Sequence, residues 1–513
     1  MSRIDFSVDG RDVAVDDDGA SLLEVLRDRV GVRSVKDGCS PQGQCGCCTV
    51  LVDGAPRVSC VTPARRVTGR QVTTPDGMDA RVRDRWAAAL CATGGSQCGF
   101  CTPGIIVRLA ALEAKAPPGD EGHPAVERAL QAHLCRCTGW RTILDAWDAL
   151  GDEHPARDLE AAGRRATIEG GAIQQVGPHV ALGEGGFADD DAPPDALVAV
   201  SDGRGGWVVG ETLVEARAAA GKVQGRRTTV EPQPPLALPD GEWDATLRTS
   251  WVEPAYLEPD ASWCRPGGEP ATPLANGGAF GGKRHSPVGE VARRLADEHG
   301  RAVRVLLARE DVVRLGPKRP PVAAGASADG TGVLRVVRTP GILGAIAAVA
   351  PDLVVEEVDV AGPPTSADLR AAGWAEAVVL LAGARGTTGP VRGPSGATAE
   401  ASLDGAGVHV TVRCGDPLDE VVLRSYCTGA AHMALGWVRR EGLSVDTEGQ
   451  VHDLTIRSFD VLRAVDTPPV HVTIEPDDGP PVNGSDAVFA AVAAAAWIGD
   501  GCPTDWPTGG PTR

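Results

Sequence analysis

Residues 97–104 read QCGFCTPG and residues 134–140 read LCRCTGW, and these two short stretches decide the fold of the chain around them. The first supplies a Cys-x2-Cys pair and the second a Cys-x-Cys pair. A [2Fe-2S] cluster needs four thiolates, two for each iron. The alternatives are buried free thiols or a structural zinc site, but a closed zinc tetrahedron suits the Cys-x-Cys half poorly. The four predicted cluster ligands are Cys98, Cys101, Cys135 and Cys137.

The segments around these cysteines have helical periodicity and few helix breakers. They are residues 81–91, 102–114, 124–134 and 139–150. We therefore predict an antiparallel four-helix bundle with cysteines at its helix ends, over residues 78–155. The charged stretch 152–165 is the predicted linker that follows.

A second cysteine-rich loop lies upstream, where residues 39–48 read CSPQGQCGCC. Plant-type ferredoxins place about four residues between their first two cluster cysteines, whereas this loop has one more, and Pro41 marks the expected bulge. Adjacent cysteines cannot easily face one cluster together, so we interpret Cys47 as a small packing residue. The predicted ligands of this further [2Fe-2S] cluster are Cys39, Cys45, Cys48 and Cys60.

The elements around this loop are those of a compact ferredoxin-like module. Residues 4–15 alternate apolar and polar side chains around Asp9-Gly10, which predicts a β-hairpin. Ser21 followed by Glu24 is a capping box, and it predicts a helix over residues 21–30. Strands are expected on both sides of the turn at residues 53–54. We place this domain at residues 1–77.

Composition excludes several classes of function for this chain of 513 residues. A net charge of -19 argues against nucleic acid and anionic lipid as partners. The start of the sequence lacks a basic stretch with an apolar core, and no apolar run reaches about 18 residues. Most cysteines lie between Cys39 and Cys137, which favours metal over disulfides in a reducing compartment. We expect a cytoplasmic protein without a membrane partner.

The order of these motifs resembles the iron-sulfur part of the xanthine dehydrogenase/aldehyde oxidase family of molybdenum hydroxylases. The resemblance covers about residues 1–150. It implies a β-grasp cluster nearer the outside and a helical-bundle cluster nearer the molybdenum. It also implies that Gln97 contacts the pterin cofactor.

The remaining sequence is similar to a shortened molybdopterin-binding subunit of that family. The resemblance implies a hammerhead-like domain over residues 165–250 and a mixed α+β molybdopterin-binding-like region over residues 251–513, so the overall fold class is α+β. Residues 276–283 read NGGAFGGK and match the family's GGxFGGK loop, although a glycine-rich loop by itself predicts only a turn geometry. Residues 391–396 read VRGPSG and resemble its FRGxG loop, with an ordinary surface arginine in a Gly/Pro turn as the alternative. The implied cofactor-binding residues are Gln97, Gly278, Phe280, Gly281 and Arg392.

In the family, a glutamate of a GxGE motif is the catalytic base, and residues 482–487 read VNGSDA at that place. If Asp486 replaces the glutamate, its carboxylate retreats by about 1.5 Å, and a misplacement on that scale can cost roughly a hundredfold in rate. The alternative is that Asp486 caps the helix that follows. His432, on the predicted helix over residues 430–442, is expected to be a packed histidine.

The resemblance implies a hydroxylase that oxidises an aldehyde or an N-heterocycle with water as oxygen source. Purines are disfavoured because Arg284 and Pro394 replace an acidic and an aromatic residue. The chain has no flavin domain between the two parts, so an external acceptor, a flavoprotein subunit or ferredoxin, is the expected partner. A homodimer and a heteromer both remain open, as does a dinucleotide form of the pterin. The alternatives are a non-catalytic electron-transfer or assembly subunit and a pterin-binding accessory protein.

Overall fold

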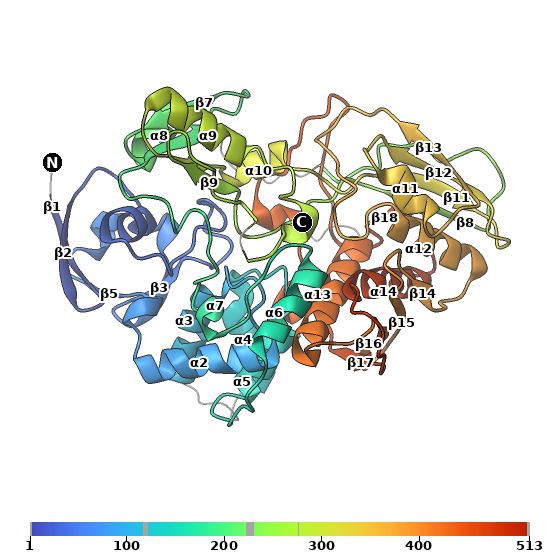
Figure 1. The fold of residues 1–513 in the computed structure, drawn as a ribbon, viewed down its shortest axis with the longest axis horizontal. Helices are drawn as coiled ribbons and strands as arrows, with labels where there is room; N and C mark the ends of the chain where they lie inside the picture. Colours follow the sequence, from blue (N-terminus) through green and yellow to red (C-terminus); the bar gives the residue numbers. More distant parts are fainter. Residues whose placement is uncertain (1–2, 116–121, 222–229, 275, 510–513) are drawn as a thin grey trace.

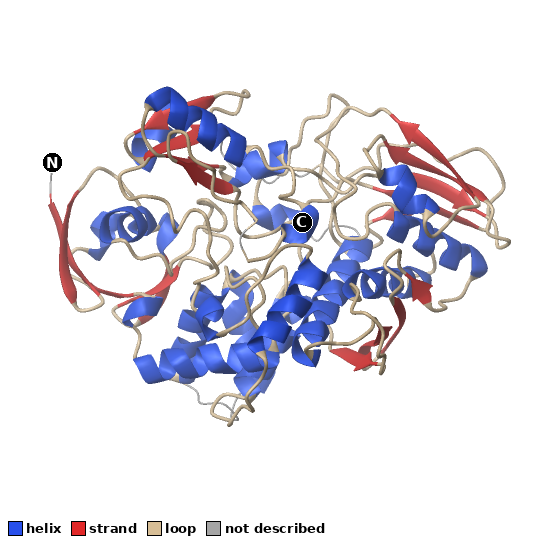
Figure 2. Ribbon diagram, in the orientation of Figure 1, coloured by secondary structure: helices blue, strands red, loops and turns tan. Residues whose placement is uncertain are grey.

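The computed structural model describes residues 3–115, 122–221, 230–274 and 276–509 (Figure 1). The N-terminal sheet lies at the left of the view, a group of helices lies below the centre, and the C-terminal half occupies the right. Figure 2 shows the sheets around the outside and most helices nearer the middle. The predicted α+β fold class is confirmed.

The N-terminal sheet has the strand order β2-β1-β5-β3-β4. Its hairpin turns at Asp9 and Gly10, whose φ angles of 51° and 77° are those a tight two-residue turn requires. The Ser21–Glu24 capping box is present. The elements are β1 (Arg3–Val8), β2 (Arg11–Asp16), α1 (Leu22–Glu24) with a π-helical continuation (Val25–Val30), β3 (Thr49–Val52), β4 (Ala55–Val58) and β5 (Gln71–Thr73).

The next segment forms the four expected helices. They are α2 (Ala80–Thr93), α3 (Thr102–Glu113), α4 (Gly122–Ala129) and α5 (Arg141–Asp148). Their core is aromatic, because Trp86 and Trp147 are buried with ring centroids 5.9 Å apart. The cysteines stand in the loops before α3 and before α5.

The predicted linker over residues 152–165 is wrong in its second half, which belongs to helix α6 (Leu159–Gly170). Arg165 on this helix is completely buried and pairs with Glu169 at 2.9 Å. Its guanidinium also donates to the carbonyls of Pro417 and Val482. A charged stretch suggested exposure, but these distant acceptors satisfy the buried charge, so tertiary contacts override the local signal.

A four-stranded sheet of order β7-β6-β10-β9 follows. It joins strands from both sides of residue 250, where we placed a domain boundary, so the region 165–250 does not contain this sheet whole. The elements are α7 (Pro178–Ala181), β6 (Leu197–Ser201), β7 (Trp207–Gly210), α8 (Leu213–Ala220), β9 (Ala261–Cys264), α9 (Val288–His299), β10 (Val303–Leu306) and α10 (Arg309–Leu315).

The C-terminal half contains two sheets, of orders β13-β12-β11-β8-β18 and β14-β15-β16-β17. Helices α13 (Glu420–Arg439) and α14 (Ser485–Gly499) pack together in its core. The other elements are β8 (Ala245–Thr249), β11 (Val322–Ala326), β12 (Gly332–Val337), α11 (Ile342–Ala347), β13 (Leu353–Val358), α12 (Trp374–Arg385), β14 (Val391–Arg392), β15 (Thr398–Asp404), β16 (Gly407–Arg413), β17 (Val470–Ile474) and β18 (Asp505–Trp506). Within the described ranges, every helix is too short or too polar to cross a lipid bilayer.

Candidate functional site

The inner quartet, which we define as Cys98, Cys101, Cys135 and Cys137, consists of two thiol pairs. Cys98 and Cys137 bring their sulfurs to 3.5 Å. Cys101 hydrogen-bonds to Cys135 and lowers the pKa of the Cys135 thiol to about 6. Among the described residues, no group of three or more His, Cys, Asp or Glu side chains is arranged to hold a single metal ion. Two thiol pairs suit two irons better than one zinc.

The outer quartet, which we define as Cys39, Cys45, Cys48 and Cys60, is buried. The first three lie in the loop before β3, and Cys60 follows β4. Hydrogen bonds from Cys45 and Cys60 hold the pKa of the Cys39 thiol well below its usual value. The backbone N–H groups of Gln42 and Gln44 also point at the Cys39 sulfur, at 3.2 and 3.5 Å. Charge on this sulfur is therefore stabilised, as a cluster ligand requires.

The loops that carry the two quartets are in direct contact. The N–H of Leu134 donates to the carbonyl of Cys45 at 3.0 Å. The ring of His133 packs on Gly46, where an added Cβ would lie 2.4 Å from the ring. Cys47 is buried in the same loop, and its assignment as a packing residue stays a prediction. The hydrogen bond from Leu134 thus links Cys45 of the outer quartet to the residue immediately before Cys135 of the inner quartet.

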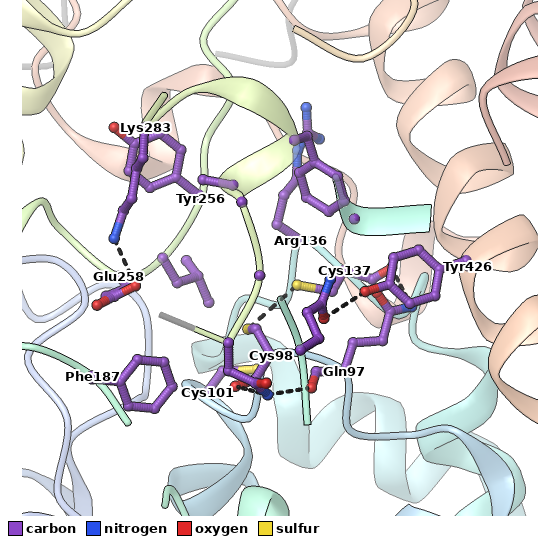
Figure 3. A pocket seen from close by; sticks show the side chains of 18 residues that line it. Gln97, Cys98, Cys101, Arg136, Cys137, Phe187, Tyr256, Glu258, Lys283 and Tyr426 are labelled. Carbon is purple, nitrogen blue, oxygen red and sulfur yellow. Dashed lines mark hydrogen bonds and ion pairs between the residues drawn. The ribbon is translucent and has the colours of Figure 1, made fainter. Parts of the chain in front are cut away.

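A cavity of about 580 Å³, which we call the first cavity, lies between the inner quartet and the glycine-rich loop (Figure 3). Asn276 holds the loop in place, because its Nδ2 donates to the carbonyls of Gln97 and Cys98, both at 3.2 Å. The Nε2 of Gln97 donates to the carbonyl of Cys137 and to the hydroxyl of Ser425, at 3.0 and 2.9 Å. Three of the predicted cofactor-binding residues line this cavity, namely Gln97, Gly278 and Phe280.

The glycine-rich loop is tightly constrained. Phe280 has a φ of 54°, which is uncommon outside glycine and marks stored backbone strain of a kind that clusters at functional sites. Gly281 does not line the cavity, but a Cβ added to it would lie 1.9 Å from the carbonyl oxygen of Asp368. Only glycine fits this position.

One wall of the first cavity carries an ion pair. Lys283 is buried and its Nζ lies 2.6 Å from Oε2 of Glu258. Burial raises the pKa of the Glu258 carboxyl, and Lys283 opposes this shift. Tyr256 lies beside the pair and donates from its hydroxyl to Asp260 at 2.8 Å. The cavity is otherwise mostly apolar, so this carboxylate is its main polar feature.

Asp486 does not line the first cavity. Its Oδ1 accepts from Nε of Arg370 at 3.1 Å, and the guanidinium of Arg370 lies 4.6 Å from the centroid of the Phe280 ring. Burial raises the pKa of the Asp486 carboxyl, with Arg370 opposing the shift. The amide oxygen of Asn483, not Asp486, accepts from the first turn of α14. Asp486 is therefore separated from the cavity by Arg370 and Phe280, and it does not cap the helix.

Arg392 is exposed on β14 and lies outside the lining of the first cavity. Arg370 is the arginine that contacts the glycine-rich loop, because its N–H also donates to the carbonyl of Phe280 at 3.1 Å. Residues 369–373 read LRAAG, with arginine and glycine three apart as in FRGxG, and this was the available signal.

His432 is a packed histidine, as predicted. It is fully buried on α13, and its Nε2 lies 2.9 Å from the carbonyl of Leu462. Burial lowers the pKa of its imidazole to about 4. The ring is therefore neutral at pH 7.

Comparison with known proteins bears on the iron-sulfur region and on the overall fold. A family model for a [2Fe-2S] binding domain matches residues 74–148. The xanthine dehydrogenase iron-sulfur-binding subunit of Escherichia coli O157:H7 is 39% identical over 132 residues, which are 25% of this chain and 79% of that protein. Aldehyde oxidoreductase of Megalodesulfovibrio gigas is 40% identical over 154 residues, 28% of this chain but 16% of that protein. The region that aligns at this level of identity is therefore only a small part of the aldehyde oxidoreductase.

The fold agrees over a longer range. The structure of aldehyde oxidoreductase from Desulfovibrio desulfuricans matches with a TM-score of 0.68 and 14% identity, over 99% of both chains. An identity this low shows a shared fold alone. Fold and sequence together define an iron-sulfur protein with a [2Fe-2S]-binding domain inside a larger α+β chain. The chain belongs to the xanthine dehydrogenase/aldehyde oxidase family of molybdenum hydroxylases.

Proposed function

We propose that this protein is a molybdenum-dependent hydroxylase. It oxidises an aldehyde or an N-heterocycle with water as oxygen source, and it passes the electrons through two [2Fe-2S] clusters to an external acceptor. One observation carries the proposal: Gln97, the glycine-rich loop and three cysteines of the inner quartet, all but Cys135, line the same cavity. A chain that only carries electrons has no need for such a cavity beside its cluster.

The described residues fit the implied cofactors. The two quartets each supply four thiols for one [2Fe-2S] cluster. The first cavity has a mostly apolar lining with a few polar side chains, as is usual for cofactor sites. Gln97, Gly278 and Phe280, which line the first cavity, would hold a molybdenum-pterin group there, and Gly281 would shape the loop beside it. When bound, this group supplies the two-electron oxidation chemistry.

The chain's own groups then position the substrate and handle protons. A general base must come within hydrogen-bond reach of the proton it accepts. Asp486 is our candidate by its place in the sequence. Its carboxylate pairs with Arg370, which opposes the rise in pKa that burial causes, and Phe280 stands between it and the first cavity, so Asp486 can act only on a substrate that passes Phe280. We propose that Arg370, which contacts Phe280, has the cofactor-side role that we expected for Arg392; neither arginine lines the first cavity.

A second candidate function is a non-catalytic electron-transfer subunit with a degenerate pterin-binding region. The position of Asp486, paired with Arg370 and outside the cavity lining, favours this alternative. In either case the electrons leave to a separate flavoprotein subunit or ferredoxin.

The first experiment is elemental analysis of the protein purified anaerobically from its native host, with EPR of the dithionite-reduced sample. The hydroxylase predicts about four iron atoms, as two clusters require, with molybdenum and two distinct cluster signals. Turnover is then sought with aldehydes and N-heterocycles. Iron without molybdenum would favour the electron-transfer subunit, and zinc in place of iron would refute the cluster assignment.

A further inference from the structure

A second cavity of about 580 Å³ lies between the N-terminal sheet domain and the sheet that contains β6 and β10. Of the described residues, only Glu258 and Phe187 line both the first and the second cavity. Carboxylates are frequent in the second cavity, and the exposed Asp28 is among its lining residues. Figure 3 shows Glu258 and Phe187 on one side of the first cavity and Tyr426 on the opposite side.

Glu258 is the single carboxylate among the described residues that line the first cavity. Its Oε2 accepts from Lys283 at 2.6 Å. Its Oε1 is shielded from solvent and has no hydrogen-bond partner among the described residues. This oxygen can therefore accept a proton from a molecule in the cavity.

The other polar side chains of the first cavity are occupied. Arg136 makes two hydrogen bonds to Glu441, at 2.5 and 2.7 Å. Tyr426 donates to Gln174 at 2.7 Å. Tyr256 donates to Asp260, which faces the second cavity. These groups leave Glu258 as the side chain best placed to take up a proton.

The charged groups around Glu258 suit a carboxyl that gains and loses protons. Burial raises its pKa, Lys283 lowers it, and Asp260 and Asp190 raise it further. Both aspartates line the second cavity. Asp260 accepts from Tyr256, and Asp190 accepts from Arg27 and Lys36, so the negative charge that draws a proton away from Glu258 lies on the side of the second cavity.

We infer that Glu258 is the proton exit of the first cavity, and that Lys283 positions it. The inference rests on the proposed function. Hydroxylation of a substrate RH follows RH + H2O → ROH + 2 H⁺ + 2 e⁻. The electrons would leave through the [2Fe-2S] clusters that the two quartets would hold, whereas each proton binds Oε1 of Glu258 and departs past Asp260 and Asp190 through the second cavity to solvent. Glu258 returns to its initial protonation state after each proton has left.

The first test measures proton release from the complete, metal-loaded protein with a pH-indicator dye in weak buffer. Glu258→Gln keeps the size of the side chain but cannot be protonated. We expect its proton release during turnover to slow by at least about tenfold, with iron and molybdenum contents unchanged. Glu258→Asp should recover part of the rate. The matched control is Glu269→Gln, because the Glu269 side chain is 89% exposed and lines neither cavity.

The second test needs no turnover. Infrared difference spectra between wild type and Glu258→Gln isolate the Glu258 carboxyl, and a downward pH jump should produce its protonated band within the mixing time. A band that takes hours to appear would mean that solvent protons do not reach Glu258, and the inference would fall. Equal proton release in loaded wild type and Glu258→Gln would overturn this inference alone. A wild-type protein without molybdenum would overturn the proposed function as well.

Discussion

Replacing Gly281 with alanine tests whether the glycine-rich loop is as constrained as its geometry indicates. Gly281 has a φ of 91°, and its added Cβ would lie 1.9 Å from a backbone carbonyl oxygen and 2.5 Å from the carbonyl carbon, both of Asp368. A backbone atom cannot rotate away as a side chain can. The left-handed conformation costs alanine roughly 1–2 kcal/mol, and the overpacking adds about 1–3 kcal/mol.

Gly300→Ala is the matched control. Gly300 ends α9 with a φ of 63°, and an added Cβ meets nothing within 4 Å, so this variant carries the backbone strain without the clash. At about 2–4 °C per kcal/mol, Gly281→Ala should melt about 2–12 °C below Gly300→Ala. Thermal unfolding followed by circular dichroism gives this difference.

The same pair of variants tests the role of the loop. Gly281→Ala must shift the loop away from Asp368, so we expect it to lose molybdenum while keeping its iron. Gly300→Ala should keep both. Equal melting temperatures and equal molybdenum contents in the two variants would refute the reasoning that the loop is a rigid part of the site.

Three further predictions follow from single side chains. Cys98→Ser removes one sulfur of the inner quartet, so iron should fall from about four to about two atoms per chain while the outer EPR signal persists. Arg136→Met leaves the buried carboxylate of Glu441 uncompensated and should cost about 3–5 kcal/mol in unfolding free energy, measured by thermal unfolding against wild type. Burial lowers the pKa of His432 to about 4, whereas the pKa of a histidine in the unfolded chain is about 6.5. Wild type should therefore lose stability as the pH falls from about 6.5 to about 4, and His432→Gln should lose less over that range.

Local signals in the sequence predicted the parts of the structure that depend on neighbouring residues. The capping box at Ser21, the hairpin turn at Asp9 and the helices around the inner quartet all form where expected. Each is decided by residues within about one or two turns of the chain, where propensity and capping operate.

The parts that were missed depend on distant contacts. Arg165 looked like an exposed linker residue because its acceptors, the carbonyls near residues 417 and 482, are hundreds of positions away. The sequence pattern named Arg392 and does not separate it from Arg370, whose pattern is similar; the contact of Arg370 with Phe280 does. Asn276 holds the loop to carbonyls of residues 97 and 98, which no local pattern reveals.

The contacts between the iron-sulfur region and the remainder bear on the choice between the two candidate functions. Arg136 pairs with Glu441 and Arg27 with Asp189, and both arginines are buried. Separating the two regions would strip these charges of their partners, at several kcal/mol for each buried ion. Buried pairs of this kind hold the inner quartet against the first cavity, which is the arrangement that electron transfer from a substrate in that cavity would require.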